Sequence, residues 1–186
     1  MTDDDVRIAR AEALLTDLGA ADSPHPGGTL LAHLRRVRSR LADWGAGSDL
    51  QLTGLCHAAY GTDGFPRPLL PLDRRGELAA VIGDAAEAGV YLYAACDRGA
   101  TYPTLTGPGA PFRDRFTGAT LAPGPLALAG FAELSAANEI DLAVDDPAFR
   151  DRWGTQLLAL FTRFGPLLSR AAREDCRAVL GGADYR

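Results

Sequence analysis

The chain has 186 residues, of which 47% are apolar and 23% charged, and this composition predicts one globular domain over residues 1–186. Its formal net charge of −5 argues against a protein that mainly binds nucleic acid or an anionic membrane. All 19 basic residues are arginines, so the chain has no lysine for a Schiff base or a P-loop.

The three cysteines, Cys56, Cys96 and Cys176, are far apart and show neither zinc-ligand nor CxxC spacing. We interpret them as buried, reduced residues of a cytoplasmic protein. Cys56 precedes His57, but consecutive helix residues do not face each other, which argues against a nucleophile–base pair. The acidic N-terminal segment does not resemble a signal peptide, and the longest uncharged run, 116–132, is broken by Gly and Pro and is not expected to cross a membrane.

Apolar residues recur at helical spacing along nearly the whole chain. The first helix is expected over 3–18 and the second over 30–44, with a turn at 21–28 between them. The second helix has one apolar stripe, and the opposite face carries Arg35, Arg36, Arg38 and Arg40. A third helix, over 50–60, has no formal charge and should lie in the middle of the fold, antiparallel to the second because their connection is short.

A loop at 61–73 separates these helices from a fourth, expected over about 75–98. The segment 99–125 is rich in Gly and Pro and is predicted to be a loop or lid beside a pocket. Further helices are expected over roughly 126–143, 147–164 and 166–180. The fold class is therefore all-α, a single bundle of six to seven helices.

The only three histidines, His25, His33 and His57, lie close together in the sequence. His33 borders the apolar stripe of its helix, His57 lies on the most apolar helix, and His25 lies in the turn before the first of these. Inward-pointing imidazoles from two adjacent helices and a turn predict a site for one divalent metal ion, Zn, Fe, Mn or Co. The alternative is that each histidine is a hydrogen-bonded core residue.

Such a site also needs a carboxylate. Asp97 continues the buried stripe of the fourth helix and is the expected ligand, with a surface ion pair as its alternative. Glu87 on that helix, and Glu139 and Asp141 near the end of a later apolar helix, are candidate general bases. Asn138 is a candidate substrate contact, and the alternative for these last residues is a solvated helix end.

The stretch from His33 to His57 resembles the first half of the HD-domain signature, in which a histidine on one helix is followed by a His-Asp pair on the next. An aspartate on a later helix completes the metal site of that family. The resemblance implies that His33, His57 and Asp97 are ligands. Here Ala58 follows His57, so the aspartate of the pair is missing.

Residues 20–145 are also similar to a family of small uncharacterised HD-like proteins, a domain of unknown function. The run GLCHAAYGTDGF at 54–65 is the most specific part of this resemblance. It implies that His25 replaces the missing aspartate, which gives a site of three histidines and one carboxylate. It also implies that the mouth of the pocket is lined by Tyr60, Thr62, Asp63 and Phe65.

Two classes of function stay open. The first is a metal-dependent enzyme that acts on a small metabolite, by hydrolase-type or iron-dependent oxygenase-type chemistry. The second is a non-catalytic small-molecule-binding or accessory protein that keeps a degenerate HD-like pocket. The expected partner is a small molecule rather than a nucleic acid or a membrane, and a homo-oligomer is compatible with both classes.

Overall fold

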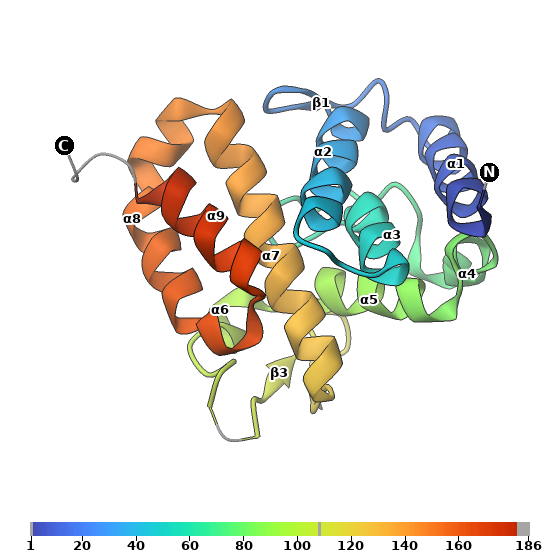
Figure 1. Ribbon diagram of the computed structural model, residues 1–186. Coiled ribbons are helices and arrows are strands. Elements are labelled where there is room, and N and C mark those ends of the chain that lie inside the picture. The colour runs from blue at the N-terminus through green and yellow to red at the C-terminus, as the bar shows by residue number, and fades with distance from the viewer. Residues whose placement is uncertain (1, 108, 182–186) are drawn as a thin grey trace.

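The computed structural model describes residues 2–107 and 109–181, and within them the fold is all-α, as predicted (Figure 1). Helices form nearly all of the regular structure of the described residues, whose β-structure is limited to two short antiparallel ladders and one isolated bridge. None of the helices in these residues is both long and apolar enough to span a membrane.

The N-terminal half holds five helices and one small ladder. The helices are α1 (Asp3–Asp17), α2 (Leu30–Asp43), α3 (Ser48–Cys56), α4 (Arg75–Ile82) and α5 (Asp84–Ala95). The strands β1 (Pro24–His25) and β2 (Gly28–Thr29) pair just before α2, and Thr29 caps that helix by accepting from the backbone N–H of Ala32. The predicted packing of α2 against α3 is present, since these two helices lie side by side.

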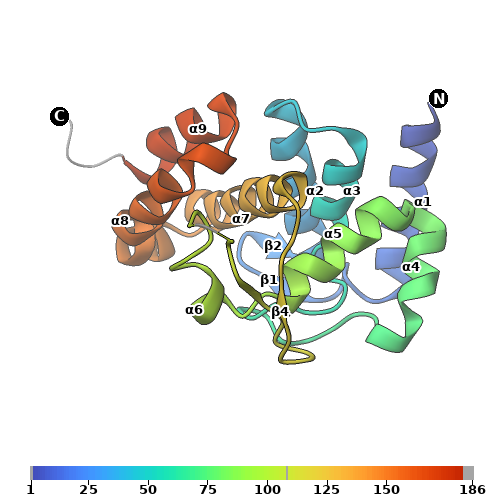
Figure 2. The same ribbon diagram turned by 90° about the horizontal axis from the view of Figure 1, so that it is seen from below.

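The C-terminal half is built around one long buried helix. Its elements are α6 (Arg98–Thr101), β3 (Phe112–Arg113), β4 (Thr120–Leu121), α7 (Pro125–Asp145), α8 (Pro147–Arg163) and α9 (Arg170–Leu180). Every residue of α7 from Phe131 to Asp141 is buried, because α2, α3, α5, α8 and α9 all pack around it. Seen from below, α7 crosses the middle of the molecule between the two groups of helices (Figure 2).

The core consists of two apolar clusters that meet at α2. One contains the inward faces of α1, α3, α4 and α5, and the other is centred on α7, α8 and α9. The α2 helix contributes Leu30 and Leu34 to the first cluster and Val37 and Leu41 to the second. It therefore connects both halves, and the candidate site lies along it.

Three predicted elements differ from the structure. The helix expected over 75–98 is broken at Gly83, whose φ of +86° and ψ of 154° are accessible almost only to glycine, and it ends at Ala95. The third helix ends at Cys56 rather than at 60. The segment 99–125 is more ordered than a plain loop, because it contains part of α6 and the β3–β4 ladder. The described residues consequently form nine α-helices where six to seven were expected.

Candidate functional site

The three histidines lie together where β1, α2 and α3 meet. His25 ends β1, His33 lies in the first turn of α2, and His57 directly follows α3. The rings of His25 and His33 are stacked with centroids 4.1 Å apart, and His57 meets His33 edge-on at 5.3 Å. Helix faces and one tight turn thus bring three residues from different elements into one cluster.

His33 is held by a buried charged network that links α2 to α7. Its Nδ1 lies 2.6 Å from Oδ2 of Asp141, and Arg36 donates to both oxygens of the same carboxylate over 2.8 and 2.9 Å. Burial disfavours the charged carboxylate, but the hydrogen bonds from His33 and Arg36 outweigh burial and hold the pKa of Asp141 below its usual value. Asp141 is therefore ionised at neutral pH and occupied by two donors, which does not suit the general-base role expected for it.

Arg36 was expected on the solvent-facing side of its helix. It follows His33 by three residues, so the two side chains share a helix face, and the carboxylate of Asp141 draws the guanidinium inward. Arg36 also reaches Asp145 at 2.5 Å.

Asn138 closes the network on the other side of the His33 ring. Its Oδ1 lies 3.1 Å from Nε2 of His33, so both ring nitrogens of His33 face an oxygen atom. Asn138 also donates from Nδ2 to Oε1 of Glu139 over 3.3 Å, and that oxygen accepts from Nη1 of Arg98 over 2.9 Å. A continuous polar chain therefore runs from α2 through α7 to Arg98.

His57 is a neutral imidazole. Its Nδ1 donates to the carbonyl oxygen of Gly54 over 2.8 Å, which leaves Nε2 as an acceptor. Burial, followed by repulsion from His33, lowers the pKa of His57 to about 3. The same two causes lower the pKa of His25 to about 4, and its Nδ1 lies 3.4 Å from the carbonyl oxygen of Pro26.

The fit of these residues to a metal ion can be judged from their donor atoms. Ligating histidines usually place the second ring nitrogen against an oxygen acceptor, and all three histidines do this with Nδ1. Nevertheless, within residues 2–107 and 109–181 no group of three or more His, Cys, Asp or Glu side chains is placed to hold a metal ion. Nε2 of His33, which a metal ion would need, faces Asn138 instead. As placed, the side chains do not fit a metal ion.

Asp97 does not join the histidines as the expected fourth ligand. The preceding helix ends at Ala95, so Asp97 no longer continues its buried stripe. It is the N-cap of α6 instead, and its Oδ1 accepts from the backbone N–H of Ala100 over 3.0 Å.

An inner pocket of about 190 Å³ opens beside the histidine cluster. It is lined by Leu30, His57, Ala58, Thr62, Gly64, Phe65, Arg98, Asn138, Glu139, Leu142 and Phe149. Three of the expected substrate contacts, Thr62, Phe65 and Asn138, therefore lie around one cavity with His57. Ala58, which directly follows His57, is also in this wall.

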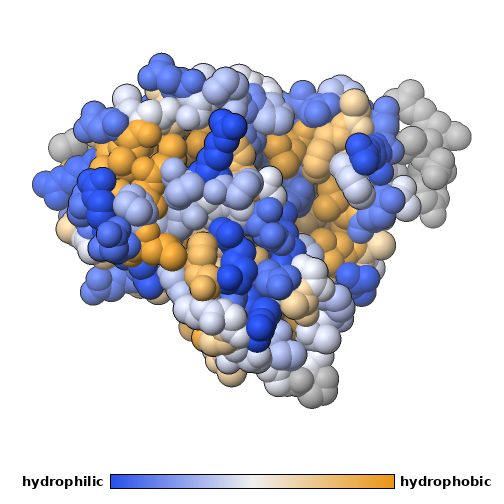
Figure 3. All heavy atoms as spheres, turned by 180° about the vertical axis from the view of Figure 1, so that it is seen from behind, coloured by the Kyte–Doolittle hydropathy of each residue, from blue (hydrophilic) through white to orange (hydrophobic). Residues whose placement is uncertain are grey.

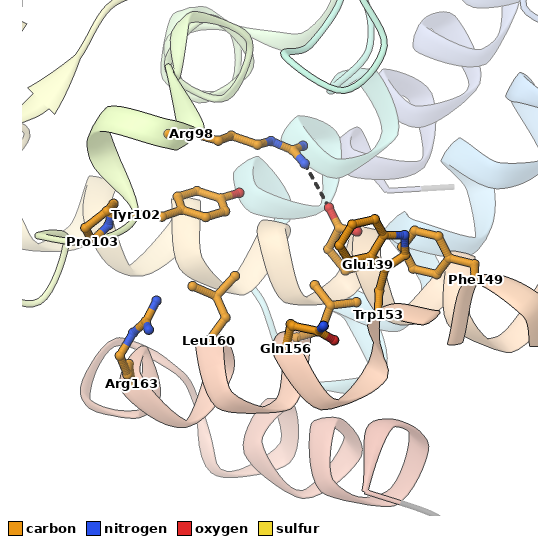
Figure 4. Close-up of a pocket in the computed structure, with 11 residues that line it drawn as sticks. Arg98, Tyr102, Pro103, Glu139, Phe149, Trp153, Gln156, Leu160 and Arg163 are labelled. Carbon is orange, nitrogen blue, oxygen red and sulfur yellow. Dashed lines mark hydrogen bonds and ion pairs between the residues drawn. The ribbon is translucent and has the colours of Figure 1, made fainter. Parts of the chain in front are cut away.

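An outer cleft of about 540 Å³ adjoins the inner pocket and shares Arg98, Glu139 and Phe149 with it. The outer cleft lies between α6 and α8, with Tyr102 on one side and Trp153 and Leu160 on the other (Figure 4). Arg98 is oriented by two acceptors, Glu139 and the hydroxyl of Tyr93, which is 3.1 Å away. On the molecular surface seen from behind, an apolar hollow bordered by polar groups lies on the side of α8 (Figure 3).

Three other expected site residues have structural partners elsewhere. Glu87 accepts from the hydroxyl of Tyr60 over 2.7 Å and forms an ion pair with Arg75 over 2.6 Å, so it links α4, α5 and the loop after α3. Asp63 accepts from the backbone N–H of Arg98 over 3.2 Å. Neither Glu87 nor Tyr60 lines the inner pocket, and their side chains are hydrogen-bonded to each other instead.

Sequence reasoning missed four residues of the site: Arg36, Arg98, Phe149 and Trp153. Arg36 carried a usable signal, namely its spacing from His33. Arg98 directly follows Asp97, and its side chain lines the cleft because the preceding helix ends at Ala95 instead of continuing through residue 98. Phe149 and Trp153 lie four residues apart on α8, which is the spacing of one helix face, but nothing in the sequence indicates what that face meets.

The cysteines carry no chemistry at this site. All three are buried free thiols. Burial raises the pKa of Cys56 to about 12, so it stays protonated beside His57 and is not an activated nucleophile.

Residues 14–98 match the model of a family described as a domain of unknown function, DUF6817. The match includes the three histidines and ends at Arg98, so it covers the walls of the inner pocket that precede α7. No match was found among curated proteins or among solved structures. The match fits the expected resemblance to an uncharacterised family, and it brings no activity with it.

Proposed function

We propose that the protein binds a small organic molecule across the inner pocket and the outer cleft. One observation carries this proposal: the two cavities adjoin at a partly buried ion pair between Arg98 and Glu139. Both of these residues and Phe149 line the inner pocket as well as the outer cleft. Concave sites of a few hundred Å³ with apolar walls and a few convergent polar groups are typical of small-molecule sites. This corresponds to the second class of function expected from the sequence.

The inner end of the cavity has groups that can orient a ligand. His57 offers an acceptor at Nε2 because its Nδ1–H is committed to Gly54. Glu139 lines both cavities and is the one candidate general base among those expected that does so. A ligand hydroxyl or amide placed there would therefore meet preorganised polar partners, at little cost in reorganisation.

A cavity-blocking pair of variants tests this proposal. Gln156 and Thr155 are both exposed residues of α8, but only Gln156 lines the outer cleft. In NMR spectra, fragments with acid, alcohol and amine groups should shift the backbone amide signals of α7 and α8 in the wild-type protein and in Thr155→Trp. They should not shift these signals in Gln156→Trp, because the new side chain fills the outer cleft. Identical shifts in all three proteins would place binding elsewhere and contradict the proposal.

A metal-dependent enzyme with an HD-like site is the second candidate. It is favoured by one observation, the placement of all three histidine Nδ1 atoms against oxygen acceptors. Against it, Nε2 of His33 faces Asn138, so this nitrogen is not free for a metal ion. Metal analysis of protein purified without chelators tests this candidate.

The metalloenzyme candidate predicts about one equivalent of Fe, Mn, Zn or Co per chain. His33→Ala and His57→Ala should lose the metal, while Cys56→Ala should keep it. A folded protein without metal would overturn the candidate and leave the binding proposal standing.

A further inference from the structure

The charges around the outer cleft are unevenly compensated. Arg98, Glu139 and Arg163 are its charged residues, and the first two neutralise each other through a 2.9 Å ion pair. Arg163, in the last turn of α8, forms no hydrogen bond or ion pair with the side chains that the structure describes. Among the residues that the structure describes, the outer cleft therefore presents one positive charge without a paired carboxylate.

The walls of the same cleft are largely aromatic and aliphatic. Phe149 and Trp153 lie one helical turn apart on α8, and Tyr102 faces them from the end of α6 (Figure 4). Trp153 is 41% exposed, so part of its ring is open to a ligand in the cleft. Leu157 and Leu160 continue the apolar wall toward Arg163.

We propose that the outer cleft takes a planar apolar molecule that carries a single carboxylate or other oxyanion. Its ring system would lie against Trp153 and Phe149, and its negative group would be bound by Arg163. This inference rests on the proposed function and adds the chemical class of the ligand.

The arrangement disfavours the other charge classes. A ligand ammonium group would meet no free carboxylate in the cleft, since Glu139 is already paired with Arg98. It would also be repelled by Arg163. A neutral ring would gain the apolar contacts but would leave the guanidinium without a ligand partner, whereas an oxyanion can accept two parallel N–H bonds from it.

Three probes with the same ring separate these classes: 2-naphthoate, 2-naphthylmethanol and 2-naphthylmethylammonium. Calorimetric titration should give the tightest binding for 2-naphthoate, by about tenfold over the alcohol, because hydrogen bonds to charged groups are the stronger ones. The indole N–H signal of Trp153 should shift with both the acid and the alcohol. Arg163→Gln should weaken 2-naphthoate by about tenfold and leave the alcohol unchanged.

Arg170→Gln is the matched control. The side chain of Arg170 is 86% exposed on α9 and pairs with Glu174, away from the cleft, so 2-naphthoate should bind this variant as it binds the wild type. If the alcohol or the ammonium probe binds as tightly as 2-naphthoate, or if Arg163→Gln weakens all three equally, the proposed ligand class is wrong although the cavity still binds small molecules. If none of the probes binds, the ligand class is also overturned, and the fragment comparison of Gln156→Trp with Thr155→Trp decides separately on the proposed function.

Discussion

His33 and Asp141 join α2 to α7 through a 2.6 Å hydrogen bond between side chains that are 1% and 3% exposed. This contact lies where the two apolar clusters of the core meet. Arg36 forms an ion pair with the same carboxylate from the more exposed side, so the charge of Asp141 is neutralised although its side chain is buried. The polar network is therefore part of what fixes the two halves of the molecule to each other, and it supports the pocket wall at Asn138.

Removing the Asp141 carboxylate should destabilise the fold strongly. Asp141→Ala leaves His33 and Arg36 without their shared acceptor, and we expect a loss of about 3 kcal/mol in the free energy of unfolding, measured by urea denaturation. Asp145 contacts the same arginine but is 24% exposed, so Asp145→Ala should cost about 1 kcal/mol or less. Equal losses of unfolding free energy in the two variants would show that the buried Asp141 carboxylate stabilises the fold no more than the partly exposed Asp145.

His57 should make the protein sensitive to mild acid. Its pKa of about 3 in the folded protein lies below the unfolded value of 6.5, so between these values the unfolded chain binds the extra proton and stability falls as pH decreases. From about pH 6.5 to about pH 5 this one group should cost about 2 kcal/mol in the free energy of unfolding. His57→Gln removes the titrating group, so its unfolding free energy should fall less over that interval. A parallel pH dependence of the two proteins would show that His57 is not buried as a neutral ring.

The His57 effect is separable from two neighbouring groups. The lowered pKa of His25 acts in the same direction, but His25 is present in both proteins and cancels in the comparison. Asp141, whose pKa is lowered, contributes stability that is lost only as pH falls below its usual value of 3.8, outside the interval tested.

Local patterns predicted which elements form, and they failed where a contact depends on distant residues. The stripe of α2 and the apolar run of α3 correctly indicated that His33 and His57 face inward, and the structure places their rings 5.3 Å apart. Asp141, the partner of His33, is 108 residues away in the chain. The apolar pattern of α7 does not indicate which way the side chain of Asp141 points, because this part of the helix is buried on all sides. The predicted position of Asp97 was wrong for another reason. The prediction assumed that the helix and its buried stripe continue to residue 97, whereas the helix ends at Ala95.

Gly83 explains the break between α4 and α5, and its replacement tests that explanation. Its backbone conformation is strained for any residue with a side chain, and an added Cβ would lie 2.9 Å from the guanidinium of Arg7. Gly83→Ala should therefore lower the free energy of unfolding by about 1–3 kcal/mol. Gly76 lies within α4, and a Cβ added there would meet no neighbouring atom within 4 Å, so Gly76→Ala should be neutral or stabilising by up to about 1 kcal/mol. A neutral Gly83→Ala would favour the continuous helix predicted over 75–98.

Glu87 should support the fold without taking part in ligand binding. Its side chain is 7% exposed, and its carboxylate accepts two hydrogen bonds from Arg75, over 2.6 and 2.7 Å, and one from Tyr60. Glu87→Ala leaves the buried Tyr60 hydroxyl without its acceptor and Arg75, which is 37% exposed, without its partner, so it should cost about 1–3 kcal/mol in unfolding free energy. The affinity for 2-naphthoate should stay within about twofold of the wild type, well under the tenfold expected from one charged hydrogen bond, at a temperature where the variant is folded.

Glu77→Ala provides the comparison for Glu87→Ala. Glu77 is half exposed and pairs with Arg74 on the surface of the same helix region, so its loss should change stability little. If Glu87→Ala instead kept its stability and lost 2-naphthoate binding, Glu87 would belong to the ligand site after all. The carboxylate would then have to reach the inner pocket, which requires the loop after α3 to release Tyr60. Rescue of binding by Glu87→Gln, which keeps the hydrogen bond from Tyr60 but not the charge, would distinguish a positioning role of that loop from direct contact with the ligand.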